Sequence, residues 1–147
     1  MSRTDALVVA AKKARQRAYA PYSQFWVGAA VESKDGRIAI GANMENACYR
    51  LGVCAEQSAL SAAQQVFGLE NVARIAIVGG HKDDTDGGNG AITPCGGCRQ
   101  AISEAAARAR RDIAIVCCDA SGEDRENYTI SELLPAGFTL EPETSSE

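Results

Sequence analysis

The 147-residue sequence has one histidine, no long apolar run and no dense stripe of basic residues. The apolar segment 6–11 is too short for the hydrophobic region of a signal peptide, and charged residues follow it directly. No stretch approaches the roughly 20 apolar residues that a membrane-spanning helix requires. We therefore expect no membrane partner and predict a cytoplasmic protein.

The charge balance argues against a nucleic-acid partner. Lys and Arg number 15 against 19 Asp and Glu, and the formal net charge is -4. Proteins that bind the phosphate backbone need clustered cations that neutralise it. The basic residues near the start of the chain are expected to form a solvated helix face: Lys12, Lys13, Arg15 and Arg17. The single histidine, His81, opens a polar loop and is predicted to be a surface residue rather than a metal ligand.

Composition and length fit one globular domain covering residues 1–147, with a tail from about residue 140 that we expect to fray. Hydrophobic residues make up 46% of the chain and charged residues 23%, as in ordinary globular proteins. Six cysteines are present. In a reducing compartment they are expected to serve as ligands or free thiols rather than as disulfides.

Helical and strand patterns alternate along the chain. Apolar spacing and turn residues predict helices over 2–17, 54–67 and 98–110, and strands over 25–32, 37–42, 72–79, 112–118 and 127–130. Asp35-Gly36 between the first two strands predicts a β-hairpin turn, because this pair tolerates positive φ. Strands that alternate with helices indicate an α/β protein built as a three-layer α/β/α sandwich.

Two short motifs carry the chemistry. Cys54-Ala55-Glu56 and, further on, Pro94-Cys95-Gly96-Gly97-Cys98 match the signature of the zinc nucleobase deaminases, with cysteine as the first ligand. A catalytic zinc site has three protein ligands and one open position, whereas a structural site is closed by four. We predict one Zn²⁺ per chain held by Cys54, Cys95 and Cys98, with Glu56 as the catalytic proton shuttle.

Other interpretations of the same residues stay open. Cys48 would close a four-cysteine structural site, and a zinc-stabilised binding module without turnover would follow. The Cys95–Cys98 pair would suit a redox enzyme if it titrated as a free dithiol. The acidic loop 81–90 resembles a calcium loop only loosely, because it lacks the closing glutamate at the required spacing.

Over residues 19–138 the chain resembles the short, homotetrameric cytidine deaminases. The resemblance is carried by segments around both cysteine motifs and by several others: Ala20-Pro21-Tyr22-Ser23 with Phe25, Val27-Gly28-Ala29-Ala30, Gly41 with Asn43 and Glu45-Asn46-Ala47-Cys48-Tyr49, Cys98-Arg99-Gln100 and Leu133-Leu134-Pro135. It implies a mixed five-stranded sheet and hydrolysis of cytidine and 2′-deoxycytidine to the uridines. It further implies a homotetramer whose active sites are shared between subunits.

The resemblance also implies residue roles. Asn43 and Glu45 would bind the ribose 3′-hydroxyl, and Phe25 would pack near the base. Ala47, Tyr49 and Phe138 would act in a neighbouring subunit's site. The full set expected to bind substrate is Phe25, Asn43, Met44, Glu45, Asn46, Ala47, Cys48, Tyr49 and Ala55.

Two departures from the family pattern bear on function. The family often has arginine directly after the catalytic glutamate, where this chain has Gln57. Three thiolates and Zn²⁺ sum to a charge of -1, and Arg99 and Arg50 are candidates to offset it. The loop 81–92 looks longer than usual and could alter substrate range. A deaminase of another aminopyrimidine nucleoside, such as blasticidin S, is the alternative function.

Overall fold

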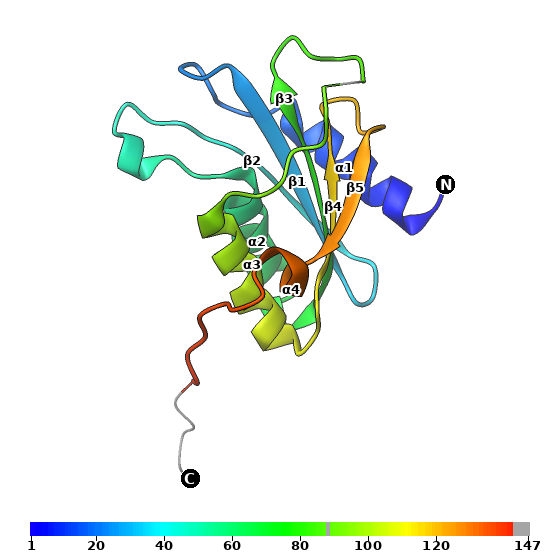
Figure 1. The fold of residues 1–147 in the computed structure, drawn as a ribbon, viewed down its shortest axis with the longest axis vertical. Helices are drawn as coiled ribbons and strands as arrows, with labels where there is room; N and C mark the ends of the chain where they lie inside the picture. The colour runs from blue at the N-terminus through cyan, green and yellow to red at the C-terminus, as the bar shows by residue number, and fades with distance from the viewer. Residues whose placement is uncertain (88, 143–147) are drawn as a thin grey trace.

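A mixed five-stranded sheet forms the centre of the computed structural model, which describes residues 1–87 and 89–142 (Figure 1). The strand order is β2-β1-β3-β4-β5. β3 and β4 are parallel, and the other neighbouring pairs are antiparallel. The strands are β1 (Phe25–Ser33), β2 (Ile38–Ala42), β3 (Val72–His81), β4 (Ala114–Cys118) and β5 (Arg125–Thr129). The predicted mixed sheet is confirmed.

Helices cover both faces of this sheet. α1 lies against one face, and α2 and α3 lie side by side against the other (Figure 1). The helices are α1 (Arg3–Arg15), α2 (Ala55–Val66), α3 (Gly96–Ala109) and α4 (Ile130–Leu133), and two short 3₁₀ turns are η1 (Tyr49–Leu51) and η2 (Leu69–Asn71). The predicted three-layer α/β/α arrangement is therefore confirmed. No helix in the described part of the chain is long and apolar enough to cross a bilayer.

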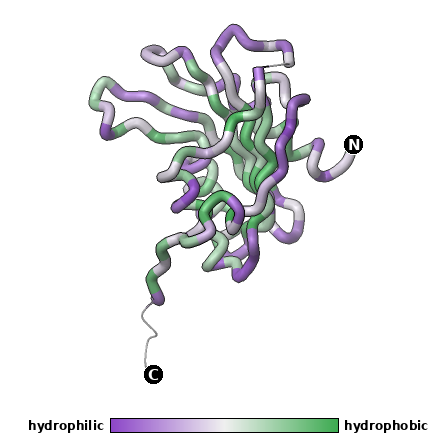
Figure 2. The backbone as a smooth tube through the Cα atoms, viewed as in Figure 1, coloured by the Kyte–Doolittle hydropathy of each residue, from purple (hydrophilic) through white to green (hydrophobic). Residues whose placement is uncertain are grey.

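Each layer boundary has its own apolar core, because side chains alternate along the strands. On β3, Ile75 and Ile77 face the α2 and α3 side, whereas Ala76 and Val78 face α1. The neighbouring Cys117 and Cys118 divide in the same way, and both are fully buried. Figure 2 shows that the most hydrophobic residues gather in these central strands and that hydrophilic residues are common on the surrounding loops and turns.

Two glycines let helices approach the sheet closely. A Cβ on Gly28 of β1 would collide with the α1 backbone at Ala11 and Arg15. A Cβ on Gly41 of β2 would collide with the α2 backbone at Ala59. Glycine in a strand commonly marks such a close backbone approach. These two contacts set the distance between the sheet and the helices that cover it.

Local signals in the sequence account for most element boundaries. Ser2 and Asp5 form a reciprocal capping box at the start of α1. Gly36 takes φ 92° in the β1–β2 hairpin, and Gly68 takes φ 85° just after α2. α3 begins at Gly96, two residues before the predicted start. The four-residue α4 was not predicted, since one turn carries no helical periodicity.

One prediction about the first helix is wrong. Arg15 is buried, with 7% of its surface exposed, whereas Lys12, Lys13 and Arg17 are exposed as expected. His81 is exposed, as predicted. Of the tail expected from residue 140, residues 143–147 lie outside the described part of the chain, as does Gly88 of the 81–90 loop.

Candidate metal centre and substrate pocket

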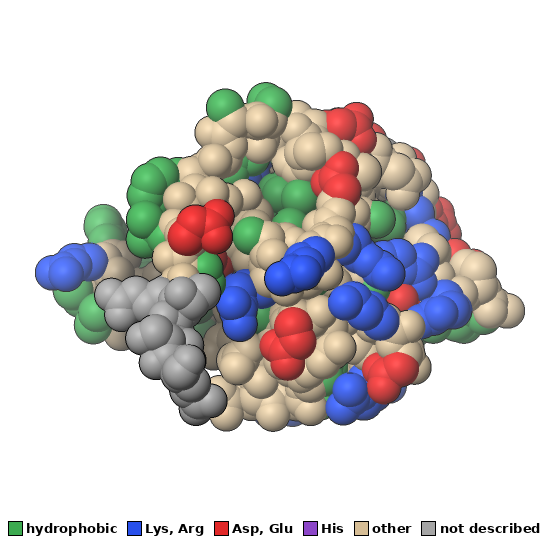
Figure 3. All heavy atoms as spheres, turned by 90° about the horizontal axis from the view of Figure 1, so that it is seen from below, with side chains coloured by type: hydrophobic (Ala, Val, Ile, Leu, Met, Phe, Trp, Pro, Cys, Tyr) green, Lys and Arg blue, Asp and Glu red, His purple; other side chains and the backbone are tan. Residues whose placement is uncertain are grey.

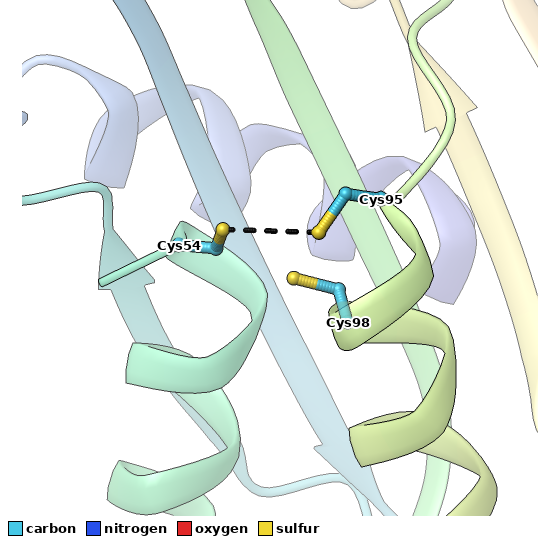
Figure 4. A group of neighbouring side chains, drawn as sticks. All are labelled: Cys54, Cys95 and Cys98. Atoms are coloured by element: carbon cyan, nitrogen blue, oxygen red, sulfur yellow. Dashed lines mark hydrogen bonds between the residues drawn. The ribbon is translucent and has the colours of Figure 1, made fainter. Parts of the chain in front are cut away.

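Three cysteine side chains from two separate segments meet at the starts of α2 and α3 (Figure 4). Their sulfur atoms all lie within 4.8 Å of one another, and Cys54 Sγ is 4.0 Å from Cys95 Sγ. Cys54 is partly buried, Cys95 is exposed and Cys98 is buried. Among the described residues, these three form the only group of potential metal ligands of this size.

The helix starts position these cysteines. Cys54 is the N-cap of α2 and Cys95 is the N-cap of α3, while Cys98 lies in the first turn of α3. The carbonyl oxygens of both N-cap cysteines accept the first intrahelical hydrogen bonds, from Ser58 and Arg99. Because helix N-termini carry partial positive charge, both helices favour the thiolate form of the cysteines at their starts.

The thiols of Cys54 and Cys98 shift each other's pKa in opposite directions. The hydrogen bond to Cys98 lowers the pKa of Cys54 to about 6. Conversely, the hydrogen bond to Cys54 and then burial raise the pKa of Cys98 above its usual range. Protein groups alone therefore do not favour three adjacent thiolates. A bound divalent cation would compensate for their charge.

The donor set fits zinc. Zinc–sulfur bonds of about 2.3 Å in tetrahedral geometry require sulfur atoms about 3.8 Å apart. The separation of 4.0 Å between Cys54 Sγ and Cys95 Sγ is close to this value. Cys48 is exposed and does not belong to the cluster, so the described residues supply three ligands and leave one position open. A closed four-cysteine structural site is thus not formed within the described part of this chain.

Glu56 lies in the first turn of α2, close enough to Cys54 to influence its thiol. It is the second residue of α2, only 5% of its surface is exposed, and burial raises the pKa of its carboxyl group. Its position two residues after Cys54 places a proton-accepting group next to the ligands without joining the cluster. This is the arrangement expected for a general acid/base.

The two arginines considered for charge compensation do not contact the thiolates. Arg99 instead donates to the carbonyl oxygens of Pro94 and Leu133 and to Thr93 Oγ1. Arg50 is exposed in η1 and has no described bond to a cysteine. The side-chain amide of Gln57 donates to Cys98 Sγ at 3.6 Å. The neutral amide of Gln57 therefore contacts a cysteine of the cluster from the position where the family often has a positively charged arginine.

A pocket of about 290 Å³ opens beside Cys54. Most of its wall is the predicted sugar-binding segment, which runs from the end of β2 into η1. The lining residues are Tyr22, Asn43, Met44, Glu45, Asn46, Tyr49, Gly52, Val53 and Cys54. The structure thus brings the predicted segment and the first zinc ligand into one cavity. Tyr22, Gly52 and Val53 were missed as lining residues, although the Ala20-Pro21-Tyr22 motif signalled the first.

The two polar residues expected to bind ribose have well-defined backbone partners. Glu45 Oε1 accepts hydrogen bonds from the amides of Tyr22 and Ser23. The side chain of Ser23, followed by these amides, holds the pKa of the Glu45 carboxyl group below its usual value. The Asn43 side chain donates to Phe25 O and accepts from Val27 N, both at 2.9 Å. Asn43 therefore fastens the end of β2 to the start of β1.

The remaining residues predicted to bind substrate differ in their exposure and in whether they line the pocket. Phe25 is 40% exposed at the start of β1, and Ala47 and Cys48 are exposed on the loop after β2, outside the pocket lining. Ala55 is fully buried at the start of α2. Tyr49 lines the pocket yet remains 86% exposed. A single chain leaves this aromatic ring almost uncovered.

Charge on the rest of the surface is mixed. Figure 3 shows one face, seen from below, where Lys and Arg side chains gather with Asp and Glu among them. No unbroken basic stripe runs across this face, as phosphate-backbone binding would require. The absence of a nucleic-acid partner remains a prediction from the charge balance.

Comparison with known families gives a match over most of the chain. The family "Cytidine and deoxycytidylate deaminase zinc-binding region" matches residues 1–113, which include all three cysteines of the cluster. The cytidine deaminase of Halalkalibacterium halodurans is 42% identical over 135 residues, covering 92% of this chain and 93% of the relative. That of Sporosarcina psychrophila is 37% identical over 137 residues, covering 93% and 92%.

Solved structures give the same result. The crystal structure of cytidine deaminase from Burkholderia pseudomallei superposes with a TM-score of 0.80 and 39% identity, covering 94% of this chain and all of the other. The cytidine deaminase structure from Mycobacterium leprae gives a TM-score of 0.70 at 33% identity, covering 92% and 99%. Sequence and fold thus agree on the same group of proteins.

Proposed function

Because this chain belongs to the cytidine and deoxycytidylate deaminase family of zinc enzymes, we propose that it hydrolyses cytidine and 2′-deoxycytidine to uridine and 2′-deoxyuridine with release of ammonia. The single observation that carries the proposal is the pocket in which the Asn43–Tyr49 segment meets Cys54. A sugar-recognising wall beside a metal centre suits a nucleoside whose base reacts at the metal. We place the reaction in cytoplasmic pyrimidine salvage.

Cys54, Cys95 and Cys98 would hold the zinc ion. When bound, zinc supplies Lewis acidity that lowers the pKa of water to about 7. Gln57 donates one hydrogen bond to Cys98 Sγ and so takes up part of the thiolate charge. Second-sphere donors of this kind orient metal ligands and tune their basicity.

Glu56 moves the protons of the reaction. Its carboxylate takes a proton from the attacking water and passes it to the ring nitrogen beside the amino-bearing carbon, while the water oxygen bonds to that carbon. Glu56 then takes the remaining proton of this oxygen and delivers it to the amino group, and the carbon–nitrogen bond breaks to release ammonia as the carbonyl group forms. One water is consumed, the amino group leaves, and a carbonyl oxygen replaces it. The burial of Glu56 shields these transfers from bulk solvent.

The nucleoside is oriented by the pocket wall. Glu45 has one carboxylate oxygen engaged with backbone amides, which leaves Oε2 to accept a hydrogen bond from the ribose 3′-hydroxyl. Asn43 holds the wall in place through β1, and its second amide N–H can donate to the oxygen of the same hydroxyl. Phe25 provides an aromatic surface for the base.

The proposal includes a homotetramer with shared active sites. Several large apolar side chains around the pocket are left uncovered in one chain: Tyr22, Met44, Tyr49, Leu51 and Val53. Phe138, expected to reach a neighbour's site, is 67% exposed. Exposed apolar surface of this kind marks interaction sites. Light scattering that finds a stable, fully active monomer would exclude the shared-site arrangement.

The decisive experiment measures ammonia release from zinc-loaded protein. Cytidine, 2′-deoxycytidine, cytosine, adenosine and blasticidin S are compared, each with and without a zinc chelator. We expect chelator-sensitive turnover of the first two substrates and little of the others. Turnover of blasticidin S alone would show that the substrate is another aminopyrimidine nucleoside. No turnover of any substrate at one zinc per chain would refute the proposal.

A further inference from the structure

Arg15 at the end of α1 differs from the other basic residues of its helix. Its surface is 7% exposed, whereas Lys12 and Lys13 face solvent. Burying a charged side chain is costly unless its charge and its donors find partners. A buried arginine outside the metal centre and the substrate pocket therefore needs an explanation.

The guanidinium group joins the ends of two strands. Arg15 Nε donates to Trp26 O on β1 at 3.1 Å. Its Nη2 donates to Gly80 O at 3.1 Å and to His81 O at 2.6 Å, at the end of β3. The same group stacks over the Trp26 ring, 5.9 Å from its centroid. One side chain thus binds three main-chain carbonyl groups of paired strands.

The close approach of α1 makes this reach possible. Gly28 lies two residues beyond Trp26 on β1, and any side chain there would collide with the backbone of Arg15 itself. The helix therefore rests on the strand at this point. From there the arginine side chain extends along the sheet to the first residues of β1 and the last residues of β3.

The strand ends that Arg15 joins lead into the proposed site. Phe25 pairs with His81 across β1 and β3. Phe25 and Trp26 point to opposite faces, because neighbouring residues alternate along a strand. Trp26 is stacked against Arg15, so Phe25 lies on the face that carries α2, α3 and the metal centre. On its other edge, this end of β1 is held by the Asn43 side chain.

The segment that carries Cys95 also departs from this point. Just after β3, Asp84 N donates to His81 O and Asp84 Oδ2 accepts from His81 N, which makes a tight turn beside the guanidinium. The chain returns at Ile92, whose side chain fills the space above Gly79. Cys95 follows three residues later. Both ends of the loop are thus anchored on the strand end that Arg15 binds.

We propose that Arg15 is a positioning residue for nucleoside binding, which fixes the open ends of β1 and β3 so that Phe25 and the segment before Cys95 hold their places. The inference rests on the proposed function, since Phe25 is assigned there as the surface for the base. Arg15 itself touches neither the substrate nor the metal. Its effect passes through three carbonyl groups and the two strand ends that contain them.

The test compares Arg15→Met, Arg15→Lys and the control Lys13→Met, an exposed position on the same helix. Methionine keeps the apolar stem and removes all donors, and lysine keeps one charged donor group but cannot bridge three carbonyls. For Arg15→Met we expect KM for cytidine to rise about tenfold with kcat within about twofold and zinc content unchanged, which is loss of uniform binding. The KM of Arg15→Lys should lie between those of Arg15→Met and wild type, and the KM of Lys13→Met should equal that of wild type.

Hydrogen exchange at the strand end separates this inference from the proposed function. In Arg15→Met and Arg15→Lys we expect faster exchange of the His81 amide, with the α2 amides unaffected. If wild-type protein showed no turnover, the proposed function would fail and the exchange result alone would decide whether Arg15 fixes the strand ends. A lower melting temperature with wild-type KM and wild-type exchange would overturn the positioning role. If Arg15→Met does not fold, Arg15→Lys carries both measurements.

Discussion

The amide nitrogen of Gln57 lies 3.6 Å from Cys98 Sγ and donates to it across the gap between α2 and α3. Among the described residues, it is the one side-chain nitrogen with a hydrogen bond to a cysteine of the cluster. The donor is neutral, so zinc with three thiolates keeps a net charge of -1 at this centre. Zinc retention should therefore depend on this hydrogen bond.

Gln57→Leu should weaken zinc retention without disturbing the fold. Loss of a second-sphere partner commonly reduces metal affinity about ten- to a hundredfold. Zinc transfer to a coloured chelator gives the measurement, and Gln65→Leu, at an exposed position of the same helix, is the matched control. Equal transfer rates in the two variants would show that the bond to Cys98 contributes nothing to metal binding.

Glu56→Gln should abolish turnover while keeping zinc. The amide cannot carry a proton between water and the ring, and general acid/base residues contribute about 10²- to 10⁴-fold to rate. Ammonia release and zinc content are measured on the same sample, with Glu104→Gln on the exposed face of α3 as the control. A Glu56→Gln variant that retains wild-type turnover would remove Glu56 from the mechanism.

Arg99→Ala should destabilise the segment that presents Cys95. The guanidinium binds Pro94 O, Leu133 O and Thr93 Oγ1, so its removal leaves two carbonyl groups of different segments without this partner. We expect a lower free energy of unfolding, by about 1–3 kcal/mol. Denaturant unfolding of the zinc-loaded protein measures it. Arg108→Ala, at an exposed position on the same helix, should change little.

Gly28→Ala should be among the more damaging single-methyl changes in the sheet. The new Cβ would meet the α1 backbone at Ala11 and Arg15, which cannot move as a flexible side chain could. Overpacking of this kind costs about 1–3 kcal/mol or more. Gly96→Ala is the control for unfolding, because a Cβ added there would have no neighbouring atom within 4 Å. Equal unfolding midpoints would show that α1 can lift from β1 at little cost.

Stability at acid pH should depend on Asp5. Hydrogen bonds from Ser2 and Arg125 lower the pKa of Asp5 to about 2 from its ordinary value of 3.8. A carboxyl group whose pKa is lower in the folded state stabilises the fold above its unfolded pKa, and this contribution is lost as pH falls through the folded pKa. The difference in melting temperature between wild type and Asp5→Asn should therefore be full above about pH 4 and shrink towards about pH 2. A difference that stays constant over this range would contradict the assignment.

Much of the metal centre was readable from local sequence. The motifs Cys54-Ala55-Glu56 and Pro94-Cys95-Gly96-Gly97-Cys98 predicted the three ligands, and Cys54 and Cys95 are N-caps with Cys98 in the first turn of α3. The alternation of strands and helices likewise predicted the three layers. Within each motif, helix or strand the residues are a few positions apart, and backbone geometry converts such spacing directly into shared faces.

Partners distant in sequence were decided by the tertiary structure. Arg15 belongs by sequence to a run of basic residues that predicts a solvent-exposed face. Gly28, however, lets α1 pack closely on β1, and Arg15 is buried there. Arg99 is by sequence one of two candidates to offset the thiolate charge, and the fold directs it to the main-chain carbonyls of Pro94 and Leu133. An arginine has several donors and a long stem, so its partner depends on which carbonyl groups the fold leaves within reach.

The sequence by itself therefore predicted the cysteine cluster, the glutamate beside it and the layer order, because a two-part motif and the alternation of strands and helices indicate them. Only the tertiary structure decided how the Asn43–Tyr49 segment meets Cys54 in one pocket and which groups fix its walls. Those arrangements depend on how closely helices and strands approach one another. That distance is set by side chains, or their absence at Gly28 and Gly41, on elements far apart in the chain.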